Sequence, residues 1–511
     1  MPSHSENTRR IAKNTLMLYA RMLFGMVVSL YTSRVVLEAL GIEDFGIYNV
    51  VGGLIGLLTI VFGSLSSAVS RFLTFELGRG DSEMLRRIFS TAVWIFVAIS
   101  LVVLILAESL GLWFLNTHMT IPSDRMVAAN WVFHLTVIGF ISSLLTIPYN
   151  ASIVAHERMG AFAYIGILEV LLRLAIVLFV AYVPVPADHL VLYGFLQLAV
   201  GLLLQAIYWT YCRRHFSECR VEYRFDRQCW REMSSFAGWN FIGASAAILR
   251  DAGGNVVLNL FFGPVVNAAR GVSQQVNNTI MGFVNNFLAS VRPQITKSYA
   301  SGDRGYMLSL MFRASRFSFY LLFALSLPVF FNTEFILSVW LKTVPDHTAN
   351  FLRLVLVYSL CETLSYPLIT AMLATGRIRN YQLVVGGLQL LNLPVAYVLL
   401  YFGAVPETLL CVAIILSVCC LVARLVMLRG MIGLSVQDFV QNVIANVTRV
   451  FVLSLIGPMS FHFLSALSGW WRFTVSVVLC LASTMVFTYF VGCTRGEQHF
   501  IREKIRRDFF K

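Results

Sequence analysis

The chain has 511 residues, of which 58% are hydrophobic and 13% are charged, and it carries a formal net charge of +13. Long apolar segments recur from one end to the other, which is typical of a polytopic membrane protein and excludes a soluble globular fold. The positive charge does not indicate nucleic-acid binding, because most Lys and Arg residues lie in short loops on one side of the membrane.

The apolar segments predict an all-α protein with fourteen membrane-spanning helices. The expected spans cover residues 14–37, 46–70, 88–115, 127–154, 160–183, 189–211, 234–261, 264–291, 307–331, 350–374, 381–402, 407–428, 443–465 and 470–492. If the N-terminus is cytoplasmic, the inner segments contain 26 Lys and Arg residues and the outer loops contain 3. This excess follows the positive-inside rule, so we expect both termini in the cytoplasm.

Similar landmarks recur about 220 residues apart, which indicates an internal repeat. The matched segments are 34–37 with 255–258, Arg71 with Arg292, 80–81 with 302–303, and Pro148, Ala155 and Arg158 with Pro367, Ala374 and Arg377. Six spans in each copy keep the same orientation, so we expect two parallel six-helix lobes related by a pseudo-two-fold axis along the membrane normal. The predicted parts are an N-terminal lobe (1–215), a basic cytoplasmic linker (216–232), a C-terminal lobe (233–430), and helices thirteen and fourteen with a basic tail (431–511).

Ten arginines lie inside the predicted spans, and none of the five lysines does. An arginine at the centre of a bilayer costs roughly 2.5–3.5 kcal/mol, so the deep ones must face water or a partner within the protein. The ten are Arg21, Arg34, Arg173, Arg250, Arg270, Arg313, Arg316, Arg353, Arg424 and Arg449. We expect Arg21, Arg173, Arg250 and Arg270 to line a cationic cavity, and Arg313, Arg316, Arg353, Arg424 and Arg449 to snorkel or to join the lobes.

In the first span, Asn14, Arg21 and Thr32 share one face. Arg34 lies on another face near the outer end, where we expect an ion pair with Glu38. In the fifth span, Glu169 and Arg173 are one helical turn apart. They form either a mutual salt bridge or a switch in which the arginine binds an anion while the glutamate takes a proton or cation.

The seventh span places Asp251, Asn255 and Asn259 at helical spacing beside Arg250, with Gly253 and Gly254 between them. A glycine pair in a span marks either a moving, cargo-facing element or close helix packing. The acids Glu169, Asp251 and Glu362 are candidates for ion coupling, or they balance neighbouring arginines.

A longer polar stripe follows the eighth span, where amides and one guanidinium recur at helical spacing. Its members are Asn267, Arg270, Gln274, Asn277 or Asn278, and Asn285. Such a stripe either lines a cavity or joins two helices by hydrogen bonds, and we favour the cavity because so many polar residues share one face. With Asn255 of the seventh span, Gln274 and Asn278 complete the predicted substrate-binding residues.

The choice of arginine over lysine indicates the class of cargo. A guanidinium is planar, permanently charged and able to hold a phosphate group with two hydrogen bonds. A pyrophosphate or an acidic sugar is therefore a suitable cargo, whereas a cationic drug is not. No nucleophile–base set, metal motif or cofactor-binding loop is evident, so we expect no catalytic residue, no metal and no cofactor.

Several segments resemble the polysaccharide-precursor flippases, the O-antigen-type members of the multidrug/oligosaccharidyl-lipid/polysaccharide (MOP) exporter superfamily. The segments are 33–53 (SRVVLEALGIEDFGIYNVVGG), 70–81 (SRFLTFELGRGD), 156–174 (HERMGAFAYIGILEVLLRL), 259–276 (NLFFGPVVNAARGVSQQV) and 291–300 (VRPQITKSYA). The resemblance implies two six-helix bundles in the bacterial inner membrane that move undecaprenyl-pyrophosphate-linked oligosaccharide from the cytoplasmic to the periplasmic leaflet. It also implies coupling to H⁺ or Na⁺ and other polysaccharide-assembly proteins as partners.

Three other functions remain open. One is a flippase for the peptidoglycan lipid precursor, which needs the same chemistry. Another is a cation-coupled small-molecule exporter of the same superfamily, although such proteins usually carry a carboxylate in the first span, where this chain has Arg21. The third is a membrane glycosyltransferase, for which Glu43 and Asp44 in the first outer loop would be the catalytic acids, against the alternative of a short acidic loop that caps the second span.

Overall fold

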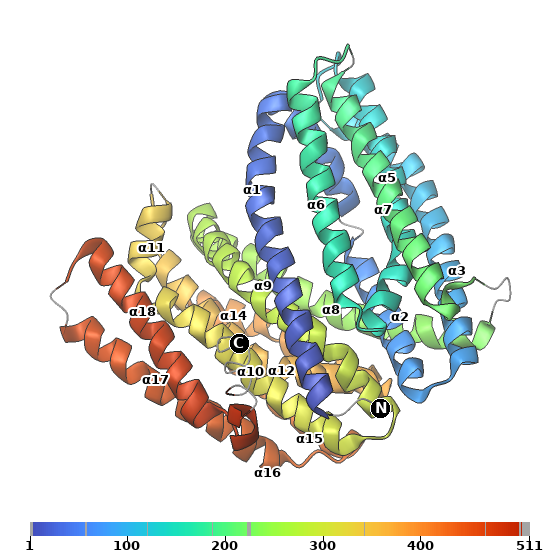
Figure 1. The fold of residues 1–511 in the computed structure, drawn as a ribbon. Helices are drawn as coiled ribbons and strands as arrows, with labels where there is room; N and C mark the ends of the chain where they lie inside the picture. Colours follow the sequence, from blue (N-terminus) through green and yellow to red (C-terminus); the bar gives the residue numbers. More distant parts are fainter. Residues whose placement is uncertain are drawn as a thin grey trace. The chain divides into compact units, whose positions relative to one another are not determined.

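The computed structural model describes residues 4–56, 59–119, 121–186, 188–221, 226–341, 343–464, 467–499 and 502, and every regular element in these ranges is helical (Figure 1). The elements are α1 (His4–Gly56), α2 (Thr59–Arg79), α3 (Ser82–Leu106), η1 (Ala107–Gly111), α4 (Leu112–His118), α5 (Met126–Ala155), α6 (Met159–Tyr182), α7 (His189–His215), η2 (Ser217–Cys219), α8 (Arg227–Phe262), α9 (Pro264–Ala300), α10 (Arg304–Phe331), α11 (Thr333–Trp340), α12 (Thr348–Thr375), α13 (Arg379–Leu390), α14 (Asn392–Tyr401), α15 (Thr408–Ile432), α16 (Val436–Phe439), η3 (Val440–Ile444), α17 (Ala445–Leu464), α18 (Gly469–Phe487) and η4 (Thr488–Gly492).

Eleven helical segments in the described residues are long and apolar enough to cross a membrane, which makes this a multi-pass membrane protein. Three expected spans, 46–70, 234–261 and 264–291, have no counterpart among the eleven. The last two correspond to α8 and α9, which are long enough but carry the polar stripes that lower their hydropathy. The total of fourteen spans therefore stays a prediction.

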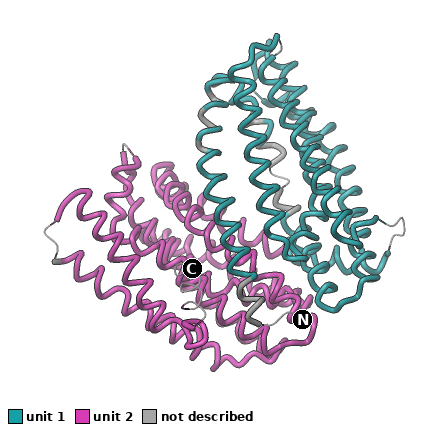
Figure 2. The backbone as a smooth tube through the Cα atoms, in the orientation of Figure 1, with its two compact units in different colours: residues 1–241 teal, residues 242–511 magenta. Residues whose placement is uncertain are grey.

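The chain divides into two compact units, Met1–Phe241 and Ile242–Lys511, and the boundary falls inside α8 (Figure 2). In unit 1, α1 packs on α6, and α5 packs on α7, α2 and α3. Near one end of this unit, Val51, Ala129, Val132, Phe133 and Leu190 form a fully buried apolar cluster. In unit 2, α12 contacts α9, α10 and α15, and α17 and α18 pack against each other and on α10. The finer division into four parts stays a prediction.

The same backbone geometry recurs in the two units at the offset of the sequence repeat. Gly41 has φ 78° and ψ 169°, and Gly263, 222 positions later, has φ 76° and ψ −171°. This conformation is essentially restricted to glycine, and it allows an abrupt change of chain direction between two helices. Asp81 and Asp303, also 222 positions apart, each cap a helix by accepting a hydrogen bond from the backbone N–H three residues later.

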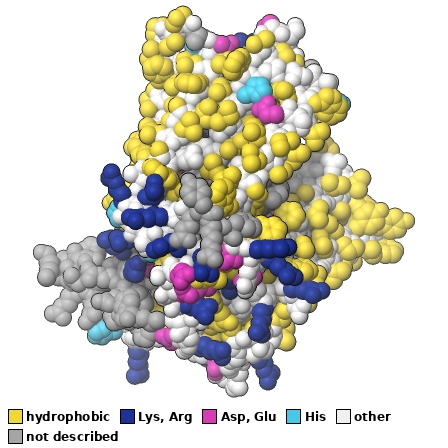
Figure 3. All heavy atoms as spheres, turned by 90° about the vertical axis from the view of Figure 1, so that its right-hand side faces the viewer, with side chains coloured by type: hydrophobic (Ala, Val, Ile, Leu, Met, Phe, Trp, Pro, Cys, Tyr) yellow, Lys and Arg dark blue, Asp and Glu magenta, His cyan; other side chains and the backbone are white. Residues whose placement is uncertain are grey.

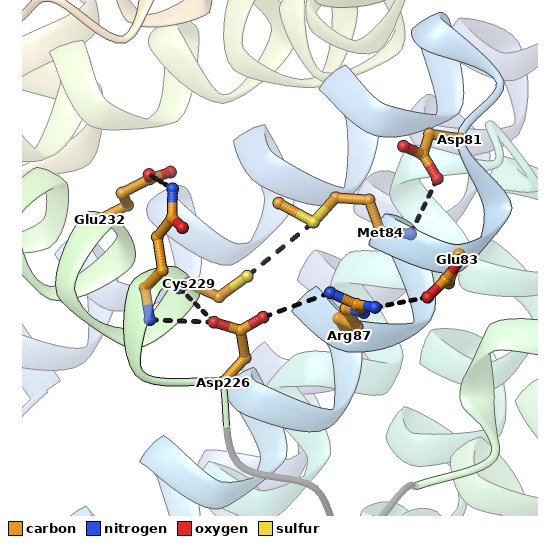
Figure 4. A network of polar contacts seen from close by, with 8 residues as sticks. Asp81, Glu83, Met84, Arg87, Asp226, Cys229 and Glu232 are labelled. Atoms are coloured by element: carbon orange, nitrogen blue, oxygen red, sulfur yellow. Dashed lines mark hydrogen bonds and ion pairs between the residues drawn. The ribbon is translucent and has the colours of Figure 1, made fainter.

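The start of α8 is held to α3 within unit 1, as Figure 4 shows. Asp226 accepts hydrogen bonds from the backbone N–H groups of Cys229 and Gln228, and its other oxygen lies 3.9 Å from Arg87 of α3. Those backbone hydrogen bonds, with the charge of Arg87, lower the pKa of the Asp226 carboxyl. Arg87 in turn pairs with Glu83 one turn earlier. The first turn of α8 is therefore fixed to α3 of unit 1.

The described surface separates apolar from basic side chains. On the face drawn in Figure 3, hydrophobic side chains cover the upper part, and Lys and Arg side chains gather below them. Many large apolar side chains are exposed along α3, α7 and α15, among them Leu101, Phe195 and Ile415. This arrangement is typical of a surface that meets lipid tails in one band and a polar interface beside it.

Candidate functional site

A polar network joins α8 to its neighbours in unit 2 and contains four of the predicted residues. The Arg250 guanidinium donates to the Asp251 carboxylate at 3.1 Å and to the Tyr358 hydroxyl of α12 at 2.7 Å. It also lies over the Tyr358 ring, 5.3 Å from the centroid. Arg250 is mostly buried, whereas the Asp251 side chain is 58% exposed. The α8 arginine is thus held by an aromatic ring and by an acid whose side chain is exposed.

Arg270 of α9 reaches back to the same segment of α8. Its Nη1 donates to the Asn255 side-chain oxygen at 2.5 Å and to the Asp251 backbone carbonyl at 3.0 Å. A Cβ atom at Gly254 would lie 3.3 Å from Arg270 Nη1, so a glycine here lets the guanidinium approach the helix backbone closely. The structure therefore brings Arg250, Asp251, Asn255 and Arg270 together. The spacing of these residues within α8 and within α9 does not by itself require this contact between the two helices.

The polar stripe of α9 divides between two environments. Gln274 donates to Asn278 at 3.3 Å, and both side chains are exposed, as is Asn285. Asn277, by contrast, is buried and accepts a hydrogen bond from Ser359 of α12 at 2.7 Å. The sequence left open whether Asn277 or Asn278 belongs to the polar stripe. Asn278 lies in the exposed stripe, and Asn277 joins α9 to α12.

In unit 1, Arg21 lies between α1 and α6. Its guanidinium is 4.3 Å from the centre of the Phe162 ring, and a Cβ atom at Gly166 would overlap it. Tyr208 of α7 interacts electrostatically with both Arg21 and Glu169. The Arg21 guanidinium therefore lies against the Phe162 ring and Gly166. Gly166 is about one helical turn before Glu169, which pairs with Arg173 on α6.

Glu169 and Arg173 form the salt bridge that their spacing allows, at 2.8 Å between Nη2 and Oε1. The Arg173 side chain remains 54% exposed and the Glu169 side chain 33% exposed. Both groups are accessible enough to exchange partners, so the structure is compatible with either reading of this pair.

A buried cluster in unit 2 was not identified from the sequence. Arg424 of α15 is 1% exposed and lies 4.0 Å from Glu362 of α12, whose carboxylate also accepts a hydrogen bond from Ser417 at 2.5 Å. Arg424 was expected to snorkel or to join the lobes, and this expectation is wrong, because its charge is buried against an acid of its own unit. The sequence contained one indication of this pair: the span 350–374 contains an acid, Glu362, and the span 407–428 contains an arginine, Arg424.

A small cavity of about 10 Å³ lies beside this cluster, close to the space needed for one water molecule. Arg250, Tyr358 and Glu362 line one part of it, and Gln389 and Asn392 line another. The helix breaks here, since α13 ends at Leu390 and α14 begins at Asn392, and the Asn392 side-chain oxygen is buried without a hydrogen-bond partner among the described residues. The polar interior of unit 2 is thus continuous from Arg250 to Glu362.

The remaining arginines of the predicted spans differ in their surroundings. Arg316 is buried and pairs with Glu497 at 2.9 Å, Arg353 pairs with Glu334 at 2.6 Å, and Arg449 is exposed. The side chain of Arg34 lies outside the described part of the structure, so its expected pair with Glu38 stays a prediction. Arg316, Arg353 and Arg449 form no contact with Arg250 or Arg270 among the described residues.

The acidic outer loop is engaged in a structural contact. Arg125 donates to Asp44 at 2.8 and 2.5 Å and to Asp188 at 2.5 Å. Although burial raises the pKa of Asp188, the hydrogen bonds from Arg125 and from the backbone N–H groups of Val191 and Leu190 leave it lowered. Asp44 therefore joins helix ends in unit 1. Among the described residues, no group of three His, Cys, Asp or Glu side chains is arranged to hold a metal ion.

Comparison with known proteins assigns the chain to a family. The family described as "Polysaccharide biosynthesis protein" matches residues 8–299. An uncharacterized membrane protein of Bacillus subtilis (strain 168), EpsK, is 20% identical over 509 residues, which cover 95% of this chain and 96% of EpsK.

Solved structures agree in fold. An outward-facing multidrug resistance MATE family transporter of the MOP superfamily matches with a TM-score of 0.69 and 12% identity, over 83% of this chain and 96% of that one. A MOP superfamily transporter from Pyrococcus furiosus Vc1 matches with a TM-score of 0.68 and 10% identity, over 83% and 96%. The chain therefore belongs to the polysaccharide biosynthesis protein family, and it is a multi-pass membrane protein whose fold is similar to that of these transporters.

Proposed function

We propose that this protein is a flippase for undecaprenyl-pyrophosphate-linked oligosaccharide, the repeat unit of an O-antigen, capsule or exopolysaccharide. It moves the head group from the cytoplasmic to the periplasmic leaflet of the bacterial inner membrane by alternating access, with fourteen spans and both termini in the cytoplasm. The observation that carries the proposal is the network of Arg250 and Arg270 beside the exposed amides of α9.

The chemistry of that network suits a pyrophosphate. Arg250 and Arg270 are two guanidinium groups on consecutive helices, and their partners are an exposed carboxylate, a hydroxyl and amide or backbone oxygens. The oxygens of a diphosphate can take the place of those of Asp251 and Asn255 and accept charge-assisted hydrogen bonds from both guanidinium groups. The exposed Gln274 and Asn278 then offer donors and acceptors to sugar hydroxyl groups.

Unit 1 offers a second cationic surface of the same kind. Arg173 is more than half exposed, and its partner Glu169 is partly exposed. Arg21 lies on the neighbouring face of α1, over the Phe162 ring. We propose that Arg21, Arg173, Arg250 and Arg270 all contact the anionic head group during transport.

Ion coupling by H⁺ or Na⁺ is part of the proposal. When an arginine transfers to the phosphate, its former acid partner becomes free to bind a cation, which would couple the two events. Glu169 and Asp251 satisfy this requirement because each pairs with an arginine and remains accessible. Glu362 is buried against Arg424 and Ser417, so a coupling role there requires a conformational change.

The competing functions differ in what they need. A peptidoglycan-precursor flippase would use the same arginines and differs only in the sugar. A cation-coupled small-molecule exporter would require an accessible acid in α1 at the position of Arg21. A glycosyltransferase would need Glu43 and Asp44 as its catalytic acids, and Asp44 is engaged in an ion pair with Arg125.

The test is transport of defined polyprenyl-linked sugars in liposomes, with leaflet accessibility as the measurement. Arg250→Ala and Arg270→Ala should abolish transport while the protein stays in the membrane, and Arg→Lys should restore only part of it, since ammonium cannot form the two-pronged contact. Arg449→Ala is the matched control, because Arg449 is exposed on α17 and lies outside the network. Wild-type transport by Arg250→Ala and Arg270→Ala would reject the proposal.

A further inference from the structure

A separate pocket of about 420 Å³ lies within unit 2, away from the polar stripes of α8 and α9. Its walls include Ser309 and Arg313 of α10, Asp438 of α16 and Asn442 of η3, and the turn between α15 and α16 closes one side. This volume is in the range of small-molecule sites in proteins. The proposed transport of the head group does not use any of these residues.

One side of the pocket carries an excess of guanidinium groups. Arg316 and Arg313 of α10 share a single oxygen of Glu497, at 2.9 and 3.5 Å. The other Glu497 oxygen accepts a hydrogen bond from the Thr494 backbone N–H at 2.7 Å. One carboxylate therefore serves two cations, and the buried Arg316 makes the shorter contact.

Arg313 is left with unused hydrogen-bonding capacity. Its side chain is 43% exposed, and the described residues offer it no partner other than Glu497. The Nε atom of Arg316 is also buried without a hydrogen-bond partner in the described part of the chain. Both residues line the pocket, and the exposed Arg313 guanidinium can bind an anion such as phosphate, which guanidinium holds with two hydrogen bonds.

The pocket is also lined by a negative charge, Asp438 of α16. Asp438 is exposed, and its carboxylate forms no ion pair with any described residue, whereas its backbone N–H is capped by Ser435. A ligand with phosphate alone would meet this carboxylate as a like charge. The accessible groups of the pocket, one guanidinium and one carboxylate, therefore fit a zwitterion with a phosphate at one end and an ammonium at the other.

The pocket lies at the ends of its helices. It is formed near the start of α10, at the end of α15, at the start of α16 and at Thr494, which follows η4. The loop charges predict that these ends are cytoplasmic, which places the pocket at the level of lipid head groups. The π-helical turn η3 contributes Asn442 to it, and such turns occur frequently at functional sites.

We propose that this pocket binds the head group of a phosphatidylethanolamine molecule of the cytoplasmic leaflet. The phosphate contacts Arg313 and the primary ammonium contacts Asp438. A choline head group has no N–H to donate to Asp438, and a glycerol head group has no cation to balance it. The site is thus selective for a phosphate joined to a primary amine, and it connects α10 to the two C-terminal spanning helices.

The test uses the full-length protein, delipidated in detergent, with thermal stability measured against added short-chain phospholipid. Phosphatidylethanolamine should raise the melting temperature of the wild type at lower concentration than phosphatidylglycerol or phosphatidylcholine. Arg313→Ala should require roughly tenfold more of it, because one charge-assisted phosphate contact is lost. Asp438→Asn should abolish the preference over phosphatidylglycerol. Arg429→Ala, which removes an exposed charge near the same helix ends, should behave as the wild type.

Two results would overturn this proposal. The first is equal stabilisation of the wild type, Arg313→Ala and Asp438→Asn by phosphatidylethanolamine. The second is stabilisation by free phosphoethanolamine at the concentration at which the lipid acts, since that outcome would assign the pocket to a soluble ligand. Because Arg313 and Asp438 lie on different helices, a folding defect in one variant leaves the other as an independent measurement.

Discussion

The imidazole of His347 lies 2.8 Å from the carboxylate of Glu407, which also accepts a hydrogen bond from Asn350 at 3.0 Å. This contact joins the start of α12 to the start of α15 in unit 2. In unit 1, Arg125 and Asp188 occupy the matching positions, 222 and 219 residues earlier, and join the start of α5 to the start of α7. The matching contacts thus contain an arginine in unit 1 and a histidine in unit 2.

The contact between His347 and Glu407 in unit 2 predicts that the stability of the protein depends on pH. Burial raises the pKa of the Glu407 carboxyl, but the hydrogen bonds from His347 and Asn350 lower it by more. The pKa of Glu407 therefore lies below its ordinary value of 4.5. A carboxyl whose folded pKa is lowered stabilises the protein above its unfolded pKa, and this stabilisation is lost as the pH falls through the folded value. We therefore expect the melting temperature of the wild type to fall more steeply below about pH 4.5 than that of Glu407→Gln.

The control for this measurement is Glu83→Gln, since the Glu83 side chain is 77% exposed. The melting temperature of Glu83→Gln should fall with pH as steeply as that of the wild type. Equal slopes for the wild type and Glu407→Gln would show that the contact does not contribute to acid sensitivity.

Gly166→Ala tests the placement of Arg21. The added Cβ atom would overlap the Arg21 guanidinium, which must then leave the Phe162 ring. Alanine is the better helix former by about 1 kcal/mol, so the helix itself should not weaken. We expect transport in liposomes to fall as far as in Arg21→Ala. Gly201→Ala on α7, where a Cβ would meet nothing within 4 Å, is the matched control. Unchanged transport by Gly166→Ala would mean that the position of Arg21 is not important.

Arg424→Ala should destabilise the protein rather than act on transport alone. Removing the guanidinium leaves Glu362 buried without its cation, and breaking a buried pair in this way costs about 3–5 kcal/mol. Thermal unfolding in detergent should show a clear loss, and the double variant with Glu362→Gln should recover part of it. Arg449→Ala, at an exposed position of α17, should melt as the wild type. A single Arg424→Ala variant as stable as Arg449→Ala would contradict the buried pair.

Gly263→Ala tests the conformation that recurs in the two units. At φ 76° and ψ −171°, a side chain is strained, and we expect a loss of about 1–3 kcal/mol in unfolding free energy. Gly271→Ala lies within α9 with open space around it and should be neutral or stabilising. Comparison of the two melting temperatures measures the difference, and the same loss in both variants would argue against backbone strain as the cause.

Features that depend on short stretches of chain could be predicted from the sequence. Helix length and hydropathy follow from local composition, so the membrane class and most spans were evident. The Glu169–Arg173 contact follows from residues one turn apart on a single helix. The membership of the family rests on long matching segments, which a single sequence displays directly.

Contacts between helices distant in the chain were decided only by the tertiary structure. The sequence placed Asn255 and Arg270 on polar faces, but their contact depends on how α8 turns into α9 at Gly263. The burial of Arg424 against Glu362 was missed for the same reason, because the two residues are 62 positions apart on different helices. A sequence determines the polarity and the period of each helix, whereas the rotation and depth at which two helices pack decide whether a charge meets lipid, water or an opposite charge.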